Sequence, residues 1–182
     1  GFRKYFDEAG FIQAYAPSLM STPSETGADV FEVTYFDKKA YLAQSPQFYK
    51  QAAMSAGFEK AFMVGPVFSA EPSFTTRHMT AFTGWDFEIS YIEDHHDVMD
   101  ELENVMVAGF TELYKELLPE LEVPAQPFPR LTMAEVKDRL KAAGIKSLRA
   151  RDLSPEEERE ISTLIKEETG SDFVFVTDYP YE

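Results

Sequence analysis

The chain has 182 residues, of which 44% are apolar, so it is long enough to bury a sizeable core and is not disordered as a whole. It has no cysteine, which excludes a disulfide scaffold, a zinc ribbon and a thiol nucleophile. A net charge of −15 argues against a nucleic-acid footprint over the whole surface, although a local basic site stays open. The sequence has no apolar run long enough for a membrane span and no signal peptide, so we expect no membrane partner and a cytoplasmic α/β domain.

The first thirty residues predict two short elements and a loop. A helical stripe of apolar residues over 2–9, followed by Gly10, predicts a helix that ends at this glycine. Residues 12–15 predict a short strand that Pro17 stops, and the Ser, Thr, Pro and Gly content of residues 18–29 predicts a loop.

A hairpin and a helix follow. Residues 30–35 and 39–42 predict the two strands of the hairpin. Ser45 as N-cap and Pro46 at the first helical position predict a helix that ends at Gly57. Its apolar stripe is expected to face inward and consists of Phe48, Tyr49, Ala52, Ala53 and Ala56.

Two long strands and a long helix come next. Residues 60–68 and 80–92 predict an antiparallel pair joined by a polar loop, with Gly84 interrupting the alternation of the second strand. Asp94 is expected to cap a helix that reaches about residue 118. The residues expected on its buried face are Val98, Leu102, Val105, Phe110, Leu113 and Leu117.

The last third predicts two capped helices and a strand. Four prolines make residues 119–129 a linker. Thr132 with Glu135, and Ser154 with Glu157, match the capping box, so each pair is expected to open a helix. The apolar run 173–177 predicts a buried strand.

No motif for nucleophilic catalysis or for a Gly-rich phosphate loop is present. His95 and His96 lie among acidic residues, but a helix N-terminus favours carboxylates in any case and adjacent side chains on a helix diverge, so we expect no metal site there. What remains is a set of charged and polar residues that would suit a small charged metabolite or a nucleotide. The set comprises Glu25, Gln47, Lys50, Glu71, Arg77 and His78.

Three segments carry a resemblance to a known family. They are residues 41–51 (YLAQSPQFYKQ), 65–78 (GPVFSAE, then TTRH) and 82–88 (FTGWDFE). In this order and spacing they closely resemble the catalytic core of aspartyl-tRNA synthetases of the archaeal and eukaryotic type, which belong to class II. The resemblance implies an α/β fold, a mainly antiparallel sheet flanked by helices, incomplete at both ends. It also implies one partial catalytic domain over residues 1–182, with a helical excursion at about 132–170.

The resemblance also implies roles for individual residues. Glu25, Gln47 and Lys50 would bind aspartate, with the Lys50 ammonium selecting the side-chain carboxylate of the substrate. The residues implied to bind ATP are Glu71, Arg77, His78, Met79 and Phe82. The partners would be aspartate, ATP and tRNA, and Mg²⁺ would be held by ligands beyond residue 182. A homodimer would form through Phe11, Ile12, Tyr15 and Pro17.

Two residues depart from the family pattern. Ser69 stands where members carry an arginine that bridges the α-phosphate and the substrate carboxylate, and Ala81 stands where members commonly carry a glutamate. The loss of the arginine removes an electrostatic clamp, so we expect impaired activity. Two other functions stay open: a stand-alone paralogue of amino-acid metabolism resembling asparagine synthetase, and a non-catalytic dimerisation or interaction module.

Overall fold

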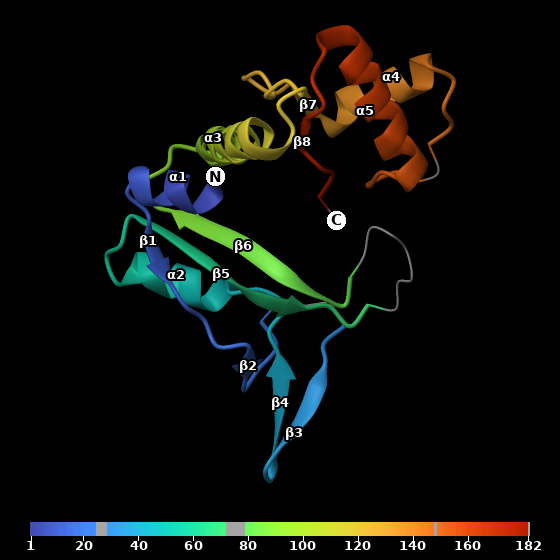
Figure 1. Cartoon of the computed structure of the whole chain (residues 1–182). Coiled ribbons are helices and arrows are strands. Elements are labelled where there is room, and N and C mark those ends of the chain that lie inside the picture. The colour runs from blue at the N-terminus through green and yellow to red at the C-terminus, as the bar shows by residue number, and fades with distance from the viewer. Residues whose placement is uncertain (25–28, 72–78, 148, 182) are drawn as a thin grey trace. The chain divides into compact units, whose positions relative to one another are not determined.

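The computed structural model describes residues 1–24, 29–71, 79–147 and 149–181 (Figure 1). These residues form two compact units. The first unit comprises Arg3–Asp94 and the second comprises Gly1–Phe2 with His95–Glu182. None of the described helices combines the length and the apolar character that crossing a membrane requires.

The first unit is organised around a three-stranded sheet with the order β1-β5-β6. β1 (Ile12–Ala14) runs parallel to β5 (Lys60–Phe68), and β5 pairs antiparallel with β6 (Ala81–Ile89). The predicted long pair is confirmed. Its register runs unbroken from Lys60 opposite Ile89 to Phe68 opposite Ala81, with Gly65 opposite Gly84, so Gly84 interrupts the apolar alternation without breaking the pairing.

One face of this sheet is an aromatic core. Phe62 and Phe87 are cross-strand partners and therefore share a face. Phe6 of α1 (Phe2–Glu8) stacks on Phe62 with ring centroids 4.6 Å apart and also contacts Phe87 and Trp85. The predicted first helix is thus confirmed, and one buried phenylalanine anchors it to the sheet.

α2 (Gln47–Ser55) packs against β5 and β6. The predicted helix is confirmed, but it begins one residue later than expected, because Pro46 is the N-cap while the Ser45 hydroxyl accepts a 3.3 Å hydrogen bond from the Gln47 amide. The predicted inward stripe is partly wrong, since Phe48, Ala52 and Ala56 are exposed. The half-buried side of α2 instead includes Gln47 and Lys50, as well as Tyr49 and Ala53.

A second sheet of the same unit has the order β2-β4-β3 and is antiparallel throughout. β3 (Glu32–Tyr35) and β4 (Lys38–Leu42) form the predicted hairpin, and Phe36 at its turn has φ +55°. β2 (Leu19–Met20) lies inside the predicted loop 18–29, which is therefore only partly a loop. Two residues are too few to show an alternation of polar and apolar positions.

The second unit contains α3 (His95–Leu117), β7 (Arg130–Thr132), α4 (Met133–Ala142), α5 (Pro155–Thr169) and β8 (Phe175–Thr177). β7 and β8 pair in parallel. The expected buried face of α3 is partly wrong, because Val98, Leu102, Leu113 and Leu117 are exposed. The core of this unit lies around α4, α5 and the strands, and includes Leu131, Met133, Val136, Leu140, Leu153, Ile161 and Ile165.

Both predicted capping boxes are present. The Thr132 hydroxyl accepts a hydrogen bond from the Glu135 amide at 3.2 Å, and the Glu135 carboxylate accepts one from the Thr132 amide at 2.7 Å. Ser154 and Glu157 make the same reciprocal pair at 3.3 and 2.7 Å. The helices α4 and α5 therefore begin where the sequence places them.

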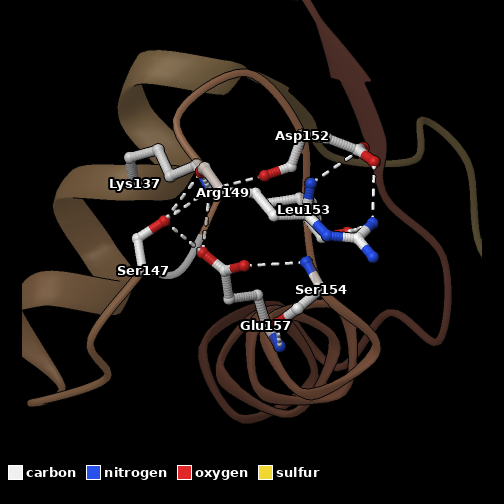
Figure 2. Close-up of polar contacts among 7 residues, drawn as sticks. All are labelled: Lys137, Ser147, Arg149, Asp152, Leu153, Ser154 and Glu157. Carbon is white, nitrogen blue, oxygen red and sulfur yellow. Dashed lines mark hydrogen bonds and ion pairs between the residues drawn. The ribbon is translucent and has the colours of Figure 1, made fainter.

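Lys137 and Glu157 form a polar centre between α4 and α5 (Figure 2). The Lys137 ammonium lies 2.8 Å from a Glu157 carboxylate oxygen and donates to the carbonyls of Arg149 and Asp152 and to the Ser147 hydroxyl. The Glu157 side chain is only 1% exposed. Burial alone would raise the pKa of Glu157, but hydrogen bonds from Lys137, Ser147 and Ser154 outweigh it and lower that pKa to about 2.

This lowered pKa predicts acid sensitivity. Because the folded pKa of Glu157 lies below its ordinary value of 4.5, its contribution to stability is present above pH 4.5 and is lost as the pH falls towards 2. Urea unfolding followed between pH 7 and 2.5 should show a falling midpoint in this window. The Glu157→Gln variant should lose less stability over the same window, and an equal loss in both proteins would contradict the assignment.

Candidate functional site

The second face of the β5–β6 pair carries a charged cluster beneath α2. Asp86 and Glu88 are two residues apart on β6, so their side chains share a face. The Lys50 ammonium forms an ion pair with Asp86, lies 3.3 Å from a Glu88 carboxylate oxygen and donates to the Phe87 carbonyl at 3.4 Å. The Lys50 side chain is 13% exposed, so it is not a solvated surface lysine.

Sequence reasoning identified Lys50 but missed the two carboxylates that hold it. The sequence does contain a pattern that indicates these carboxylates. Asp86 and Glu88 occupy alternate positions in a strand whose other face is aromatic. A strand that packs on both faces and still carries two acidic residues on one of them indicates a built polar site.

The balance of charge in this cluster defines what it can bind. One ammonium and two carboxylates leave a net charge of −1 in a partly buried setting. A zwitterionic ligand fits this arrangement, because its own ammonium can pair with a carboxylate and thereby leave Lys50 for a ligand carboxylate. Gln47 lies one turn before Lys50 on the same half-buried side of α2 and can donate or accept a hydrogen bond.

A small cavity adjoins this cluster. It measures about 30 Å³ and its lining includes Ser18, Ser45, Met63, Gly65 and Gly84. A Cβ atom on Gly84 would lie 3.3 Å from Val67 Cγ1, so any side chain there would crowd this face of the sheet.

Ser24, inside the predicted loop 18–29, ties this segment to the start of α2. Its buried hydroxyl accepts hydrogen bonds from the amides of Gln44 at 3.0 Å and Ser45 at 3.4 Å. Glu25, one of the residues predicted to bind aspartate, lies outside the described residues.

The residues predicted to bind ATP are described only in part. Phe82 pairs with Val67 and lies on the same face of β6 as Asp86, with its ring half exposed. Glu71 and Met79 are exposed, whereas Arg77 and His78 lie outside the described residues. The structure therefore brings Gln47, Lys50 and Phe82 to one face of the sheet.

Ser69 and Ala81, the two departures from the family pattern, lie at the end of the same strand pair. The Ser69 amide donates to the Thr80 carbonyl at 3.0 Å, and Ala81 is paired with Phe68. A residue at position 69 is therefore fixed at the end of β5, and its hydroxyl carries no charge with which to hold a phosphate.

The two adjacent histidines lie closer together than expected. His95 and His96 begin α3, are both exposed, and have ring centroids 4.4 Å apart, so the expectation that their side chains diverge is wrong.

Comparisons with known proteins cover the whole chain. The profile of the family described as "tRNA synthetases class II (D, K and N)" matches residues 1–182. An aspartate–tRNA(Asp/Asn) ligase of Aeropyrum pernix is 40% identical over all of this chain, which covers 43% of that relative. The cytoplasmic aspartate–tRNA ligase of Homo sapiens is 40% identical over 98% of this chain and 38% of the relative.

Solved structures of tRNA synthetases are similar to this chain as well. Asparaginyl-tRNA synthetase from Pyrococcus horikoshii, complexed with asparaginyl-adenylate, gives a TM-score of 0.81 at 32% identity and covers 98% of this chain and 42% of that one. Aspartyl-tRNA synthetase from Entamoeba histolytica gives 0.79 at 31% identity, over 98% of this chain and 35% of that one. The chain spans less than half the length of these relatives.

Proposed function

We propose that this chain, which belongs to the class II tRNA synthetase family (D, K and N), is the aspartate-activating part of a longer cytoplasmic aspartate–tRNA ligase and that its activation step is impaired. The family and its class II fold confirm the resemblance seen in the three motif segments. The reaction would join aspartate to ATP, release pyrophosphate, and then transfer the aspartyl group to tRNA. The names of the relatives favour this function over a stand-alone paralogue or an interaction module.

The observation that carries the proposal is the placement of Lys50 and Gln47 over Asp86 and Glu88. The two carboxylates would hold the α-ammonium of aspartate, and Lys50 would then pair with its side-chain carboxylate. Gln47 would orient the ligand, and Glu25 would close over it. The test is binding of aspartate against asparagine to this chain, with aspartate at least about tenfold tighter.

ATP would lie towards the end of the strand pair at which Phe82 is found. The exposed Phe82 ring would stack on the adenine, with Met79 beside it, while Glu71, Arg77 and His78 would contact the nucleotide. Mg²⁺ would neutralise charge on the phosphates when bound. Of the described carboxylates in this site, Asp86 and Glu88 are engaged by Lys50, so we assign no residue here as its ligand.

Because Ser69 stands in place of the bridging arginine, we predict that adenylate formation by this chain is undetectable. Charge develops at the α-phosphate during activation, and a neutral hydroxyl at position 69 cannot offset it as an arginine would, a loss of several kcal/mol. Aspartate-dependent exchange of labelled pyrophosphate into ATP measures this step. Exchange clearly above the background without aspartate would show that the clamp is not needed.

A homodimer is proposed from the exposed apolar residues of the β1 segment. Tyr15 is 78% exposed, and Ile12 and Pro17 are also exposed. Phe11, which was predicted in the same interface, is buried against Phe6 and Phe87 and belongs to the core instead. Sedimentation at high micromolar concentration should show a dimer that Tyr15→Lys weakens, and a clean monomer would contradict the interface.

We further propose that residues 1–182 are one partial catalytic domain, in which 132–170 form a helical excursion. The two capped helices α4 and α5 occupy that stretch, which supports the proposal.

A further inference from the structure

Positive charge is concentrated in one short stretch of this acidic chain. Residues 137–151 contain six of the 17 basic residues and one of the 32 acidic residues, a local net charge of +5. The rest of the chain therefore carries −20. This asymmetry indicates a surface for an anionic partner that the remaining surface would repel.

Three of the six basic side chains have acidic partners within the fold. Lys137 pairs with Glu157, Arg139 with Glu168 and Arg149 with Asp152. The other three are Lys141, Lys146 and Arg151.

These three side chains are exposed, and among the described residues none of them makes a side-chain hydrogen bond or ion pair. Lys141 lies in the last turn of α4, where the helix dipole favours a cation in any case. Lys146 and Arg151 follow Gly144, beyond the helix, so the dipole does not account for them. The exposed carboxylate of Asp138 is the one acidic group of the stretch.

The polar centre at Lys137 fixes the backbone that presents these cations (Figure 2). The Lys137 ammonium binds the Ser147 hydroxyl next to Lys146, at 2.7 Å. It also binds the carbonyls of Arg149 and Asp152, at 2.8 and 2.7 Å, on either side of Arg151. Holding the backbone in this way lowers the entropy that a ligand must remove on binding.

We propose that Lys141, Lys146 and Arg151 form a phosphate-binding surface for an RNA backbone. Of the described residues between them, those that are exposed are small or polar, such as Ala142, Ala143 and Ala150, and offer no apolar or aromatic anchor for a protein partner. Phosphates need only positioned cations, so this surface suits RNA better than an acidic protein. The identification of the RNA as tRNA rests on the proposed function. The argument from charge for RNA binding does not depend on that function.

The test measures RNA affinity as a function of salt. A labelled RNA stem-loop is titrated with the chain at KCl concentrations from 25 to 200 mM, and binding is followed by fluorescence anisotropy. The Lys146→Gln/Arg151→Gln variant should bind about tenfold more weakly at 100 mM, and its slope of log affinity against log salt should be shallower by about 1 per lost contact. The control, Lys38→Gln/Lys115→Gln, makes the same charge change at exposed sites elsewhere and should stay within about twofold of the unaltered chain.

Three results would overturn the proposal: no RNA binding at 25 mM KCl, equal losses in the two variants, or displacement of the RNA by an equally charged polyglutamate at the same concentration as competing RNA. Aspartate binding, measured on the same variants, separates this inference from the proposed function. Both variants should retain the aspartate preference, because neither changes α2 or β6. A variant that loses RNA binding but keeps the aspartate preference would therefore test the phosphate-binding surface independently of the proposed function.

Discussion

Lys137→Met should lower the free energy of unfolding of the unit that contains α4 and α5 by about 3 kcal/mol, the lower end for breaking a buried ion pair. The reason is that the Glu157 carboxylate, 1% exposed, would keep its burial and lose its cation. The Ser147 hydroxyl and two backbone carbonyls would lose a donor as well. Urea unfolding at pH 7 measures the change.

Two variants separate the buried pair from a general effect of removing a lysine. Lys141→Met lies one turn further along α4, at an exposed position, and should change stability by less than about 0.5 kcal/mol. The double variant Lys137→Met/Glu157→Leu removes both charges and should recover part of the loss. A Lys137→Met protein as stable as Lys141→Met would show that the polar centre contributes nothing measurable.

Lys50→Met should remove the preference for aspartate over asparagine. A charge-assisted contact in a partly dry site is worth about 1.5–3 kcal/mol, or about tenfold to a hundredfold in affinity. The structure adds a condition that the sequence did not reveal: Lys50 is already paired with Asp86 and Glu88, so the α-ammonium of the ligand must take over one of these carboxylates. NMR titration of the variant with both amino acids measures the loss.

Asp86→Asn provides the matched comparison. It should weaken aspartate and asparagine alike, because both ligands present the same α-ammonium, and should leave their ratio above one. Gln51→Met, at an exposed position on α2, controls for the change of side chain and should leave both affinities unaltered. Unchanged aspartate binding in Lys50→Met, with circular dichroism showing a folded protein, would place the substrate carboxylate elsewhere.

Local signals in the sequence were sufficient for the elements whose ends are marked by side-chain chemistry. The capping boxes at Thr132 and Ser154 located α4 and α5, because a reciprocal hydrogen-bond pair needs only residues three apart. The nine-residue strands β5 and β6 were long enough for their apolar content to be recognised. By contrast, β2 and β7 have two and three residues and exist through their partners in the sheet, which a local pattern does not reveal.

Predicting the whole site would have required knowing which strand lies under which helix. The motif around Gln47 and Lys50 was visible in the sequence, but its apolar neighbours made Phe48 the expected inward residue, whereas the structure turns Lys50 to the sheet. The pairing of Lys50 with Asp86 joins residues 36 positions apart and depends on the packing of α2 against β6. Periodicity indicates which residues share a face and leaves open what that face meets.

The central claim is that this chain recognises aspartate through Lys50, and the measurement that tests it most directly is the ratio of the dissociation constants for asparagine and aspartate. NMR titration of the unaltered chain at pH 7 gives both values under one condition. We predict a ratio of about ten or more in favour of aspartate. A ratio near one, or tighter binding of asparagine, would contradict the assignment of Lys50 as the group that selects the substrate.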